Sequence, residues 1–302
     1  MSQTHSPSGG RLCGVQRVCR VWKVPRSTLY QQRKRIAAAA GLCASPRKRG
    51  PKGMFTDEQL VEHIRSVLNE SPFHGEGYRK AWARLRFKQI RTSKERVRRL
   101  MREHGLQAAR RVGNPHGPKA HDGTIIPQQP NVMWGTDLTS TMTVQDGYAA
   151  VFVAVDHYSG ECVGIHASVR ATRFEALEPI RQGVGDYFGG FCQEAAKGLT
   201  LRHDHGSQYV SDHFQNEIRF LGITASPAFV REPEGNGCAE RFIRTLKENL
   251  LWLRTFQTVE GLRQALPEFK KLYNNQWIME RLGYRTGTQA RKDACVAVEI
   301  AA

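Results

Sequence analysis

The sequence predicts an α/β protein in which small basic helical modules precede a mixed sheet with helices on both faces. Three observations support this prediction. The chain has 302 residues, which is enough for two or three modest domains. Apolar residues recur at helical spacing before residue 110, whereas runs typical of strands follow residue 130. The charge changes at the same place, with 27 Lys+Arg against 8 Asp+Glu in residues 1–130 and 18 against 20 in residues 131–302.

The composition excludes several classes of protein. A 40% share of apolar residues is enough for a core and argues against global disorder. No stretch approaches the roughly 18 consecutive apolar residues of a membrane span, and the N-terminus lacks the apolar segment of a secretory signal. The 7 cysteines form no CxxC pair, which indicates reduced thiols rather than a disulfide scaffold or a zinc knuckle. We therefore expect a cytoplasmic protein with no membrane partner.

The basic excess lies entirely in the first 130 residues, which carry a charge of +19. So basic a segment repels itself when it is compact, unless a polyanion binds it. Nucleic acid is the polyanion that fits, because no lipid-binding helix or anchor signal accompanies the charge. The alternative is a basic face that only keeps the protein in solution.

Residues 1–44 are predicted to form a basic, helix-turn-helix-like segment. Pro25 followed by Arg26 and Ser27 is typical of a helix start, and the helix ends in a cluster of basic residues. A second helix rich in Arg and Gln is what a helix-turn-helix presents to DNA. A simple basic amphipathic helix is the alternative. A linker is expected over residues 45–55.

Residues 56–112 are predicted to form a helical DNA-binding module. Thr56 with Gln59 forms a capping-box pair, residues 77–87 form a second helix, and Thr92 with Glu95 begins a third. The alternative is a three-helix bundle with a solvated basic face. The candidate DNA contacts in this module are Arg79, Lys80, Arg96, Arg98, Arg99 and Arg102. Residues 113–130, rich in Gly, Pro and Gln, are expected to be a linker.

The remainder, residues 131–290, is predicted to be the mixed-sheet core, followed by a tail over 291–302. Its first part is an antiparallel meander of three strands, and the nearly continuous apolar run of the second strand indicates a buried central position. These strands are expected over 132–143, 147–158 and 162–169. Helices and strands then alternate, with helices over 172–189, 211–222, 237–253 and 258–274, and strands over 199–204 and 223–228.

Three carboxylates are placed to meet in this topology. Asp137 lies midway along the first strand, Asp204 ends the fourth, and Glu240 lies in the first turns of the helix after the fifth. The first and fourth strands are expected to be neighbours at the sheet centre, with the helix crossing their ends. Carboxylates that lie close together repel each other unless a divalent cation separates them. Oxygen ligands favour Mg²⁺ or Mn²⁺ over zinc, and two such ions about 4 Å apart can drive phosphoryl transfer.

The segments around these carboxylates resemble the DDE transposases and retroviral integrases. They read WGTDLT around Asp137, RHDHGSQYVS around Asp204 and NGCAERFIRTLKEN around Glu240, and 35 residues separate the last two carboxylates. Lys247 follows after six more residues, which completes the D–D-35-E–K pattern of this superfamily. The segments GYRKAWARLR and TSKERVRRLMREHGL resemble the N-terminal module of OrfB proteins of the insertion-sequence family numbered three. The resemblance covers roughly residues 55–290.

The resemblance implies a ribonuclease-H-like catalytic core whose Asp137, Asp204 and Glu240 hold the metal ions, Mg²⁺ or Mn²⁺. It implies a bacterial DNA transposase that cleaves one strand at an element end and transfers the freed 3′-hydroxyl to target DNA. DNA integration and recombination of this kind need no covalent protein–DNA intermediate. Lys247 lies two turns beyond Glu240 on the same side of the helix, where it can meet a phosphate; the alternative is an ordinary surface lysine.

Neighbouring residues allow competing interpretations. His203 and His205 suggest zinc, yet on a strand they point away from the residue between them, so the three cannot bind one ion. Asp156 is a fourth carboxylate near the site, and a role in a turn is favoured. Trp134 is expected in the core rather than as a base-stacking platform. Asn236 is assigned to a mobile loop before the catalytic helix.

The C-terminal segment departs from the family pattern, with Trp277 where the family has Arg, Met279 where it has His and Gly287 where it has Pro. Family members often act with, or as a fusion to, an upstream-frame partner called OrfA. Pairing two DNA ends further implies a homo-oligomer on DNA.

Two other functions stay open: a DNA-binding regulator or element relic with a catalytically dormant core, and a simple nuclease such as a ribonuclease H. The second does not account for the basic first 130 residues.

Overall fold

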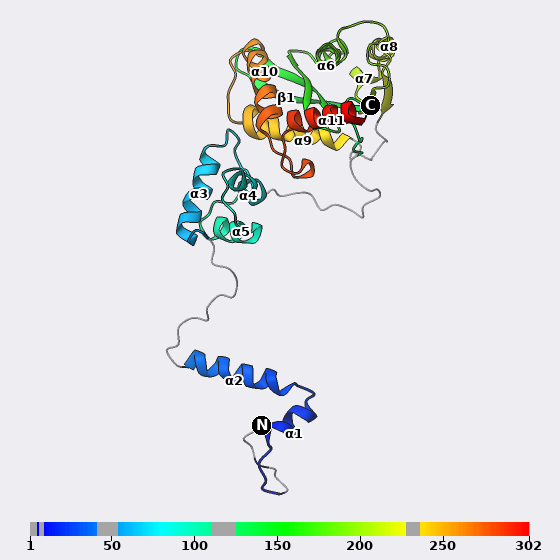
Figure 1. Cartoon of the computed structure of the whole chain (residues 1–302). Helices are drawn as coiled ribbons and strands as arrows, with labels where there is room; N and C mark the ends of the chain where they lie inside the picture. The colour runs from blue at the N-terminus through cyan, green and yellow to red at the C-terminus, as the bar shows by residue number, and fades with distance from the viewer. Residues whose placement is uncertain (1–4, 6–8, 41–53, 110–124, 228–235, 302) are drawn as a thin grey trace. The chain divides into compact units, whose positions relative to one another are not determined.

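The computed structural model divides the chain into two units, Met1–Gly53 and Met54–Ala302 (Figure 1). It describes residue 5 and residues 9–40, 54–109, 125–227 and 236–301. Most of the two expected linkers, 45–55 and 113–130, therefore lies outside the described residues. No helix in the described parts of the chain is long and apolar enough to cross a lipid bilayer.

The first unit contains two helices, α1 Val15–Val21 and α2 Arg26–Ala40. The carbonyl of Pro25 accepts the backbone N–H of Thr28 at 3.1 Å, so α2 begins where the sequence predicts. Between the helices, Lys23 adopts a left-handed φ of 51°, which turns the chain. The helix-turn-helix character of this unit stays a prediction.

The second unit begins with a three-helix module, formed by α3 Asp57–Asn69, α4 Tyr78–Phe87 and α5 Lys94–Glu103. The predicted capping box is present, because the Thr56 hydroxyl accepts Gln59 N–H at 3.3 Å and the Gln59 side chain accepts Thr56 N–H at 3.0 Å. The third helix begins one residue later than predicted. Ser93, not Thr92, is its N-cap and accepts the N–H of Arg96 at 3.2 Å.

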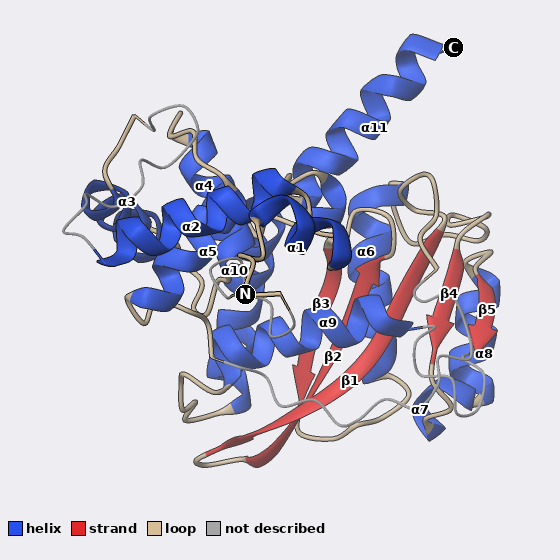
Figure 2. Cartoon of the chain, turned by 90° about the horizontal axis from the view of Figure 1, so that it is seen from below, coloured by secondary structure: helices blue, strands red, loops and turns tan. Residues whose placement is uncertain are grey.

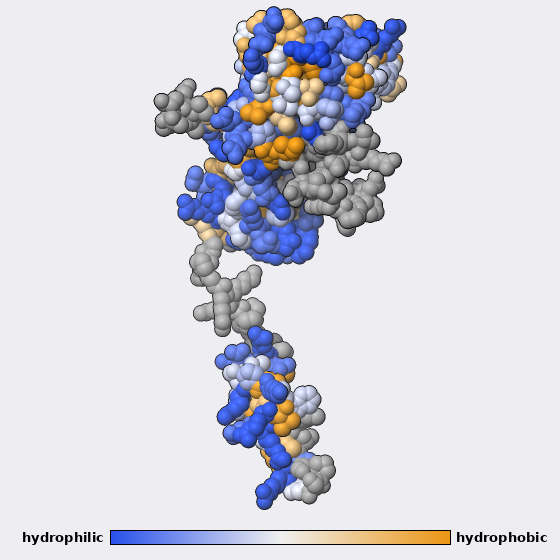
Figure 3. Space-filling model, turned by 90° about the vertical axis from the view of Figure 1, so that its right-hand side faces the viewer, coloured by the Kyte–Doolittle hydropathy of each residue, from blue (hydrophilic) through white to orange (hydrophobic). Residues whose placement is uncertain are grey.

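The module has its own apolar core and a polar surface. Its fully buried side chains are Leu60, Ile64, Ala81, Leu85, Val97, Leu100 and Met101. The surface seen in Figure 3 is mostly hydrophilic over these helices. Beneath this surface, the buried carboxylate of Glu76 accepts two hydrogen bonds from Arg84, at 2.6 and 2.9 Å. The negative charge of Glu76 is therefore paired.

A five-stranded sheet of order β3-β2-β1-β4-β5 forms the second part of this unit (Figure 2). The first three strands form the predicted antiparallel meander, and β4 pairs with β1 in parallel. The predicted neighbours at the sheet centre are therefore confirmed. The strands are β1 Met133–Thr143, β2 Gly147–Asp156, β3 Cys162–Ser168, β4 Thr200–His203 and β5 Thr224–Pro227.

Helices cover both faces of the sheet. The alternation of side chains along β2 divides the core, because Val151 and Val153 belong to one apolar cluster and Phe152 to the other. The first cluster includes side chains of α9 Gly237–Leu246 and α10 Val259–Gln276. The second includes those of α6 Glu178–Phe188 and α8 Asp212–Phe220. Among the described residues, shorter turns of helix lie in the connections: η1 Glu175–Leu177, α7 Ser207–Val210, the π-helical η3 Lys247–Leu251 and η4 Glu280–Leu282.

Trp134 lies in this core, as predicted, and it explains a glycine in α6. Its side chain is fully buried against Tyr187 and Phe188. A Cβ at Gly183 would lie 2.7 Å from the Trp134 ring, so any larger residue would displace the indole. Gly183 is therefore tolerated inside the helix because the close packing requires it.

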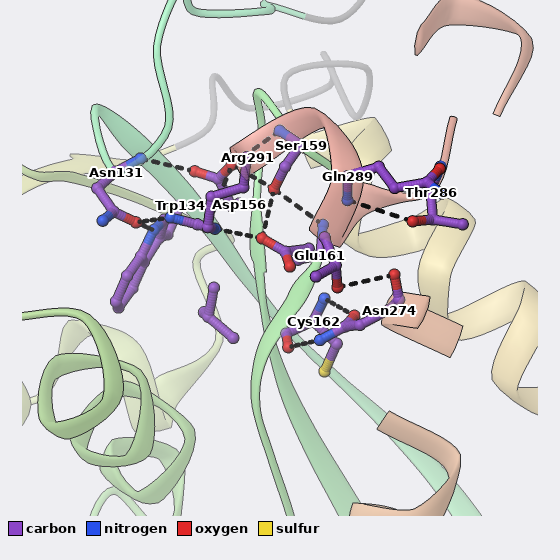
Figure 4. Close-up of polar contacts among 12 residues, drawn as sticks. Asn131, Trp134, Asp156, Ser159, Glu161, Cys162, Asn274, Thr286, Gln289 and Arg291 are labelled. Atoms are coloured by element: carbon purple, nitrogen blue, oxygen red, sulfur yellow. Dashed lines mark hydrogen bonds and ion pairs between the residues drawn. The ribbon is translucent and has the colours of Figure 1, made fainter. Parts of the chain in front are cut away.

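The C-terminus differs from the expected tail. A helix, α11 Gly287–Ala301, runs across the predicted domain boundary at residue 290. Its Arg291 enters a buried network with both carboxylates of the β2–β3 turn, Asp156 and Glu161 (Figure 4). Arg291 also donates to the Asn131 side chain at 2.8 Å. Residue 291 is thus part of the core.

Asp156 has the role in the turn that the sequence favours. Its Oδ2 accepts the backbone N–H of Ser159 at 2.8 Å and the Ser159 hydroxyl at 2.7 Å. Its Oδ1 accepts the N–H of Asn131 at 3.0 Å. Because Asp156 pairs with Trp134 across the sheet while Asp137 pairs with Val153, the carboxylate stands well along the strand from Asp137.

Candidate active site

Asp137 lies at the centre of the sheet, on the middle strand β1. Its side chain is half-buried, and its Oδ1 accepts the N–H of Leu138 at 2.7 Å. β1 has neighbours on both sides, so its backbone is held by hydrogen bonds along both edges near this residue. The backbone that carries the carboxylate is therefore paired with β2 at Asp137 itself and with β4 up to Gly135.

Asp204 follows β4 directly, next to this central strand. The parallel register pairs Met133 with Thr200 and Gly135 with Arg202. Continued by two residues, that register brings Asp204 beside Asp137. The Asp204 side chain is exposed, and its Oδ1 accepts the N–H of Gly206 at 2.9 Å.

Glu240 lies in the first turn of α9, and Asn236 ties this helix to β1. Asn236 is only 5% exposed, and its Nδ2 donates to the carbonyl of Thr136 at 2.9 Å. Gly135 leaves the necessary room, because a Cβ there would lie 2.5 Å from the Asn236 Oδ1. Asn236 itself is thus buried and bonded to β1, whereas the segment before it, residues 228–235, lies outside the described residues, so the predicted mobile loop stays a prediction. Asn236 positions the Glu240 helix against the strand that carries Asp137.

These elements form one pocket with a volume of about 360 Å³. Two of the three predicted carboxylates, Asp137 and Glu240, line it, and so does Lys247. Asp204 is not among the lining residues. The complete wall is Asp137, Leu138, Thr139, Glu240, Ile243, Arg244, Lys247 and Trp252.

The electrostatics of the pocket link all three carboxylates. The pKa of Asp137 is raised from 3.8 to about 6, first by burial and then by the negative charges of Asp204 and Glu240. The hydrogen bond from Leu138 N–H and the positive charge of Lys247 oppose this rise. The charges of Asp204, Glu240 and Lys247 therefore all act on the Asp137 carboxyl group. These four residues are the ones that the sequence predicts to lie together.

The donor set fits a divalent cation such as Mg²⁺ or Mn²⁺. It consists of carboxylate oxygens, the ligands that these hard ions prefer, and a cation would relieve the repulsion that raises the pKa of Asp137. Among the residues that the structure describes, no three His, Cys, Asp or Glu side chains already lie close enough together to hold a metal ion. His203, which the sequence also offered as a metal ligand, is buried against Tyr209 and Phe214.

The predicted DNA contacts of the helical module have different environments. Arg98 and Arg102 are exposed, one turn apart on α5, and Arg98 forms an ion pair with Glu95 at 2.8 Å. Arg79 is exposed and forms an ion pair with Glu280 at 2.7 Å. The remaining three face protein groups: Arg96 and Arg99 contact Asp57, and the 18% exposed Lys80 side chain lies 3.6 Å from Glu76 and over the Trp277 ring. Contact with DNA stays a prediction for all of them.

Two of the departures from the family pattern now have structural explanations. Trp277 packs against Phe73 with ring centroids 4.9 Å apart, so it joins the segment before α4 to the end of α10. Gly287 begins α11 beside the buried network. A Cβ at Gly287 would lie 2.5 Å from the Glu161 Cγ, so the Pro of the family pattern would not fit here.

Sequence reasoning missed three residues of the site. The Asn236 contact was hidden because its partner is a backbone carbonyl of a distant strand. Arg244 lines the pocket one turn before Lys247, and helical spacing from Glu240 would have indicated it. Trp252 lines the pocket through an irregular π-helical turn, which no periodicity predicts.

Comparisons with known domain families agree with this architecture. An integrase core domain model matches residues 127–233, and a second integrase core domain model matches residues 221–286. An HTH-like domain model matches residues 56–113. The predicted integrase-type core and its preceding helical module are confirmed.

Two relatives of the chain come from insertion elements of Escherichia coli. The chain is 28% identical over 257 residues to the transposase InsD of the IS2 elements, which covers 82% of this chain and 83% of the relative. It is 27% identical over 302 residues to an uncharacterized 48.2 kDa protein of element IS2A, covering 96% and 68%. The magnesium complex of the HTLV-2 integrase catalytic core is 20% identical, with a TM-score of 0.41 over 54% of this chain and 98% of that one.

The chain thus has an integrase core preceded by an HTH-like domain, and it is homologous to a transposase. This homology supports a transposase function and indicates a DDE polynucleotidyl transferase.

Proposed function

We propose that this protein, an integrase-core homologue of the IS2 transposase, cleaves and joins DNA with Asp137, Asp204 and Glu240 as its catalytic carboxylates. The observation that carries the proposal is the shared pocket of Asp137, Glu240 and Lys247. The charge of Asp204 acts on the same carboxyl group. A site of this kind supports phosphoryl transfer, because its acids collect a cation and its lysine attracts a phosphate.

The reaction takes place in two phosphoryl transfers. In the first, a water oxygen bonds to the scissile phosphorus, the bond from phosphorus to the 3′ oxygen breaks, and a 3′-hydroxyl is released. In the second, this hydroxyl oxygen bonds to a phosphorus of target DNA and displaces another 3′ oxygen. Divalent metal ions, two by analogy with related chemistry, would be held by Asp137, Asp204 and Glu240 and, when bound, would activate the attacking oxygen and stabilise the leaving oxygen.

The residues of the chain bind and orient the DNA in this scheme. Asp137, Asp204 and Glu240 provide the ligands of the ions, and Lys247 binds a phosphate oxygen beside them. Asn236 keeps the Glu240 helix against the Asp137 strand through its 2.9 Å hydrogen bond. No serine or tyrosine is needed as a nucleophile, since both attacking oxygens come from water and DNA.

We infer that the helical module binds the element ends. Arg98 and Arg102 are exposed on one face of α5, and although Arg98 pairs with Glu95 at 2.8 Å, a phosphate backbone can compete for this exposed guanidinium and bind Arg102 beside it. Residues 1–44 add a further basic segment. We further propose that the chain is an OrfB-type protein of the insertion-sequence family numbered three, that it acts as a homo-oligomer on DNA, and that an OrfA product assists it at the nucleoid.

The test uses short duplexes copied from the DNA on either side of the gene. Wild-type protein, Glu240→Gln and Glu268→Gln are incubated with labelled duplexes in Mg²⁺ or Mn²⁺, and cleavage and joining are followed on a denaturing gel. Glu268 is exposed on α10 and outside the pocket, so it is the matched control. We expect metal-dependent cleavage and joining by wild type and Glu268→Gln, and none by Glu240→Gln.

Two results would contradict the proposal. Normal cleavage by Glu240→Gln would remove this carboxylate from the site. Salt-sensitive DNA binding without cleavage by wild type, in either metal and with the OrfA product added, would instead establish the regulator or relic with a dormant core.

A further inference from the structure

Trp252 is a large apolar side chain that the fold leaves in solvent at the pocket. Its exposed fraction is 68%, whereas Trp134 in the same core is fully buried. A single exposed apolar residue is common and needs no explanation by itself. Trp252 is different because it forms part of the wall that also contains Asp137 and Glu240.

A change of helical pitch brings Trp252 to this wall. In a continuous α-helix, position 251 would lie one turn beyond Lys247 on the pocket face. The π-helical turn Lys247–Leu251 contains one additional residue, so Trp252 takes that place. The backbone N–H of Trp252 donates to the Lys247 carbonyl at 2.9 Å, five residues earlier in the chain. Leu250 and Leu251 are each 5% exposed and anchor the turn in the core.

The groups around Trp252 match the parts of a nucleotide. Asp137 and Glu240 lie where the proposed function places the scissile phosphate, and Lys247 and Arg244 offer positive charge to phosphates. An indole adds a flat aromatic face, on which a nucleobase of any sequence can stack. Bases within a duplex have both faces covered by their neighbours, so only a base taken out of the stack can use this surface.

We infer that Trp252 stacks on an unpaired base beside the scissile phosphate and so stabilises an opened DNA end in the pocket. This inference rests on the proposed function and extends it, because it assigns a preference for ends whose terminal pairs open. Trp252 is a positioning residue here: it holds the base, and the phosphate attached to that base then lies at the carboxylates. Loss of one base–aromatic stack is expected to weaken end binding roughly 10-fold to 100-fold.

The experiment is a double-mutant cycle between protein and DNA. Trp252 is changed to Ala, or to Phe, which keeps an aromatic face. The duplexes copied from the gene flanks carry either a normal base or an abasic site at each position near the cleaved bond. Binding is measured by fluorescence anisotropy in the Glu240→Gln background, and cleavage is measured separately with an intact Glu240. Tyr148→Ala is the control, because Tyr148 is 45% exposed and outside the pocket.

At one DNA position, we expect Trp252→Ala and the abasic site to weaken binding singly, with no further loss when they are combined. Trp252→Phe should keep most of the affinity, and Tyr148→Ala should bind like the parent protein. Additive losses at every position would overturn the inference. So would a changed oligomeric state of Trp252→Ala in light scattering without coupling to any base, since the ring would then contact a second protein.

The two proposals fail separately. If the intact protein cleaves DNA but Trp252 shows no coupling to any base, the stacking proposal is wrong and the transposase function is still supported. If Trp252 and a base are coupled in the binding assay but the intact protein does not cleave DNA, the stacking proposal is supported and the proposed reaction is wrong.

Discussion

Two groups of acidic residues, one around Asp137 of β1 and one around Asp156 at the end of β2, have opposite electrostatic surroundings. Asp137, on β1, lies in the pocket among other carboxylates, and its pKa is raised to about 6. Asp156, at the end of β2, is fully buried, yet it accepts three hydrogen bonds and lies 3.6 Å from Arg291. Burial alone therefore does not distinguish them. The difference is whether the protein itself supplies the compensating groups.

The contrast separates a site built to bind from one built to hold the fold together. The buried network joins three segments that are distant in sequence, the start of β1, the β2–β3 turn and α11 (Figure 4). In the pocket, Lys247 opposes the negative charge, yet the pKa of Asp137 stays raised. Clustered acids whose charge the chain does not fully compensate are typical of functional sites. Changing single members of each group tests this comparison.

The largest effect on stability is expected from Arg291→Leu. The substitution leaves the carboxylates of Asp156 and Glu161, 0% and 3% exposed, without their cation. Breaking a buried ion pair costs about 3–5 kcal/mol, so the free energy of unfolding, measured by urea denaturation, should fall by this amount.

The control for Arg291→Leu is Arg285→Leu, which removes an ion pair between Arg285 and Asp293 whose side chains are 49% and 56% exposed. Its cost should stay below about 1 kcal/mol. Equal losses for the two variants would show that the network does not differ from a surface pair.

The next effect has the opposite sign: Asp137→Asn should stabilise the protein in the presence of EDTA. The folded state raises the pKa of this carboxyl from 3.8 to about 6, so ionisation above that range favours unfolding. The shift corresponds to roughly 3 kcal/mol at most, and the same substitution should abolish cleavage. Denaturation with EDTA, at a series of pH values, measures the gain.

The pH dependence follows from the direction of the shift. Below about 4, both folded and unfolded states carry a protonated Asp137, so the variant should have no advantage. The advantage should develop between about 4 and about 6 and then remain constant. Asp186→Asn, at a 59% exposed side chain outside the pocket, is the control for removing a surface carboxylate. A pH-independent difference would mean that the carboxylate is not destabilised by its surroundings.

The sequence predicts the pocket better than the network, for reasons visible in particular residues. Asp137, Asp204 and Glu240 follow a spacing within one folding unit, and the alternation and length of the apolar runs place their strands correctly. The partners Glu161 and Arg291 are 130 residues apart, and nothing in either local segment indicates the other. The helix of residues 287–301 was missed for the same reason, because its key contact is long-range.

Irregular backbone accounts for what was missed in the pocket itself. Trp252 reaches the wall through a π-helical turn, whereas regular spacing would have chosen Leu251. The partner of Asn236 is a main-chain carbonyl, which every residue carries, so the sequence contains no signal for this contact. Local pattern thus predicts which elements form, and tertiary contacts decide how the site is completed.

A smaller effect on stability is expected from Asn236→Ala. This variant tests whether Asn236 affects cleavage through the geometry of the pocket rather than through the stability of the fold. Loss of the hydrogen bond to the Thr136 carbonyl should cost about 1 kcal/mol of folding free energy. Cleavage should fall more steeply, because the start of the Glu240 helix loses its hydrogen bond to the Asp137 strand, while the buried side chains of α9 still pack on the sheet. Unfolding and cleavage rates are measured on the same preparation. Asn275→Ala, at an exposed residue of α10 that bonds only within its helix, is the control. Cleavage that falls only in proportion to the folded fraction would show that Asn236 has no positioning role.

The smallest effect on stability is expected from Lys247→Gln, and here the pocket should differ most clearly from the network. Lys247 lies at the partly exposed pocket wall, so its loss should change the free energy of unfolding by less than about 0.5 kcal/mol. If it binds one phosphate, the slope of log affinity against log salt should decrease by about 1, for every duplex alike. Lys197→Gln, at a 73% exposed lysine outside the pocket, should leave the slope unchanged. An unchanged salt slope for Lys247→Gln would mean that Lys247 is an ordinary surface lysine. A reduced slope with an unchanged free energy of unfolding would show that its charge acts on the bound DNA and not on the fold.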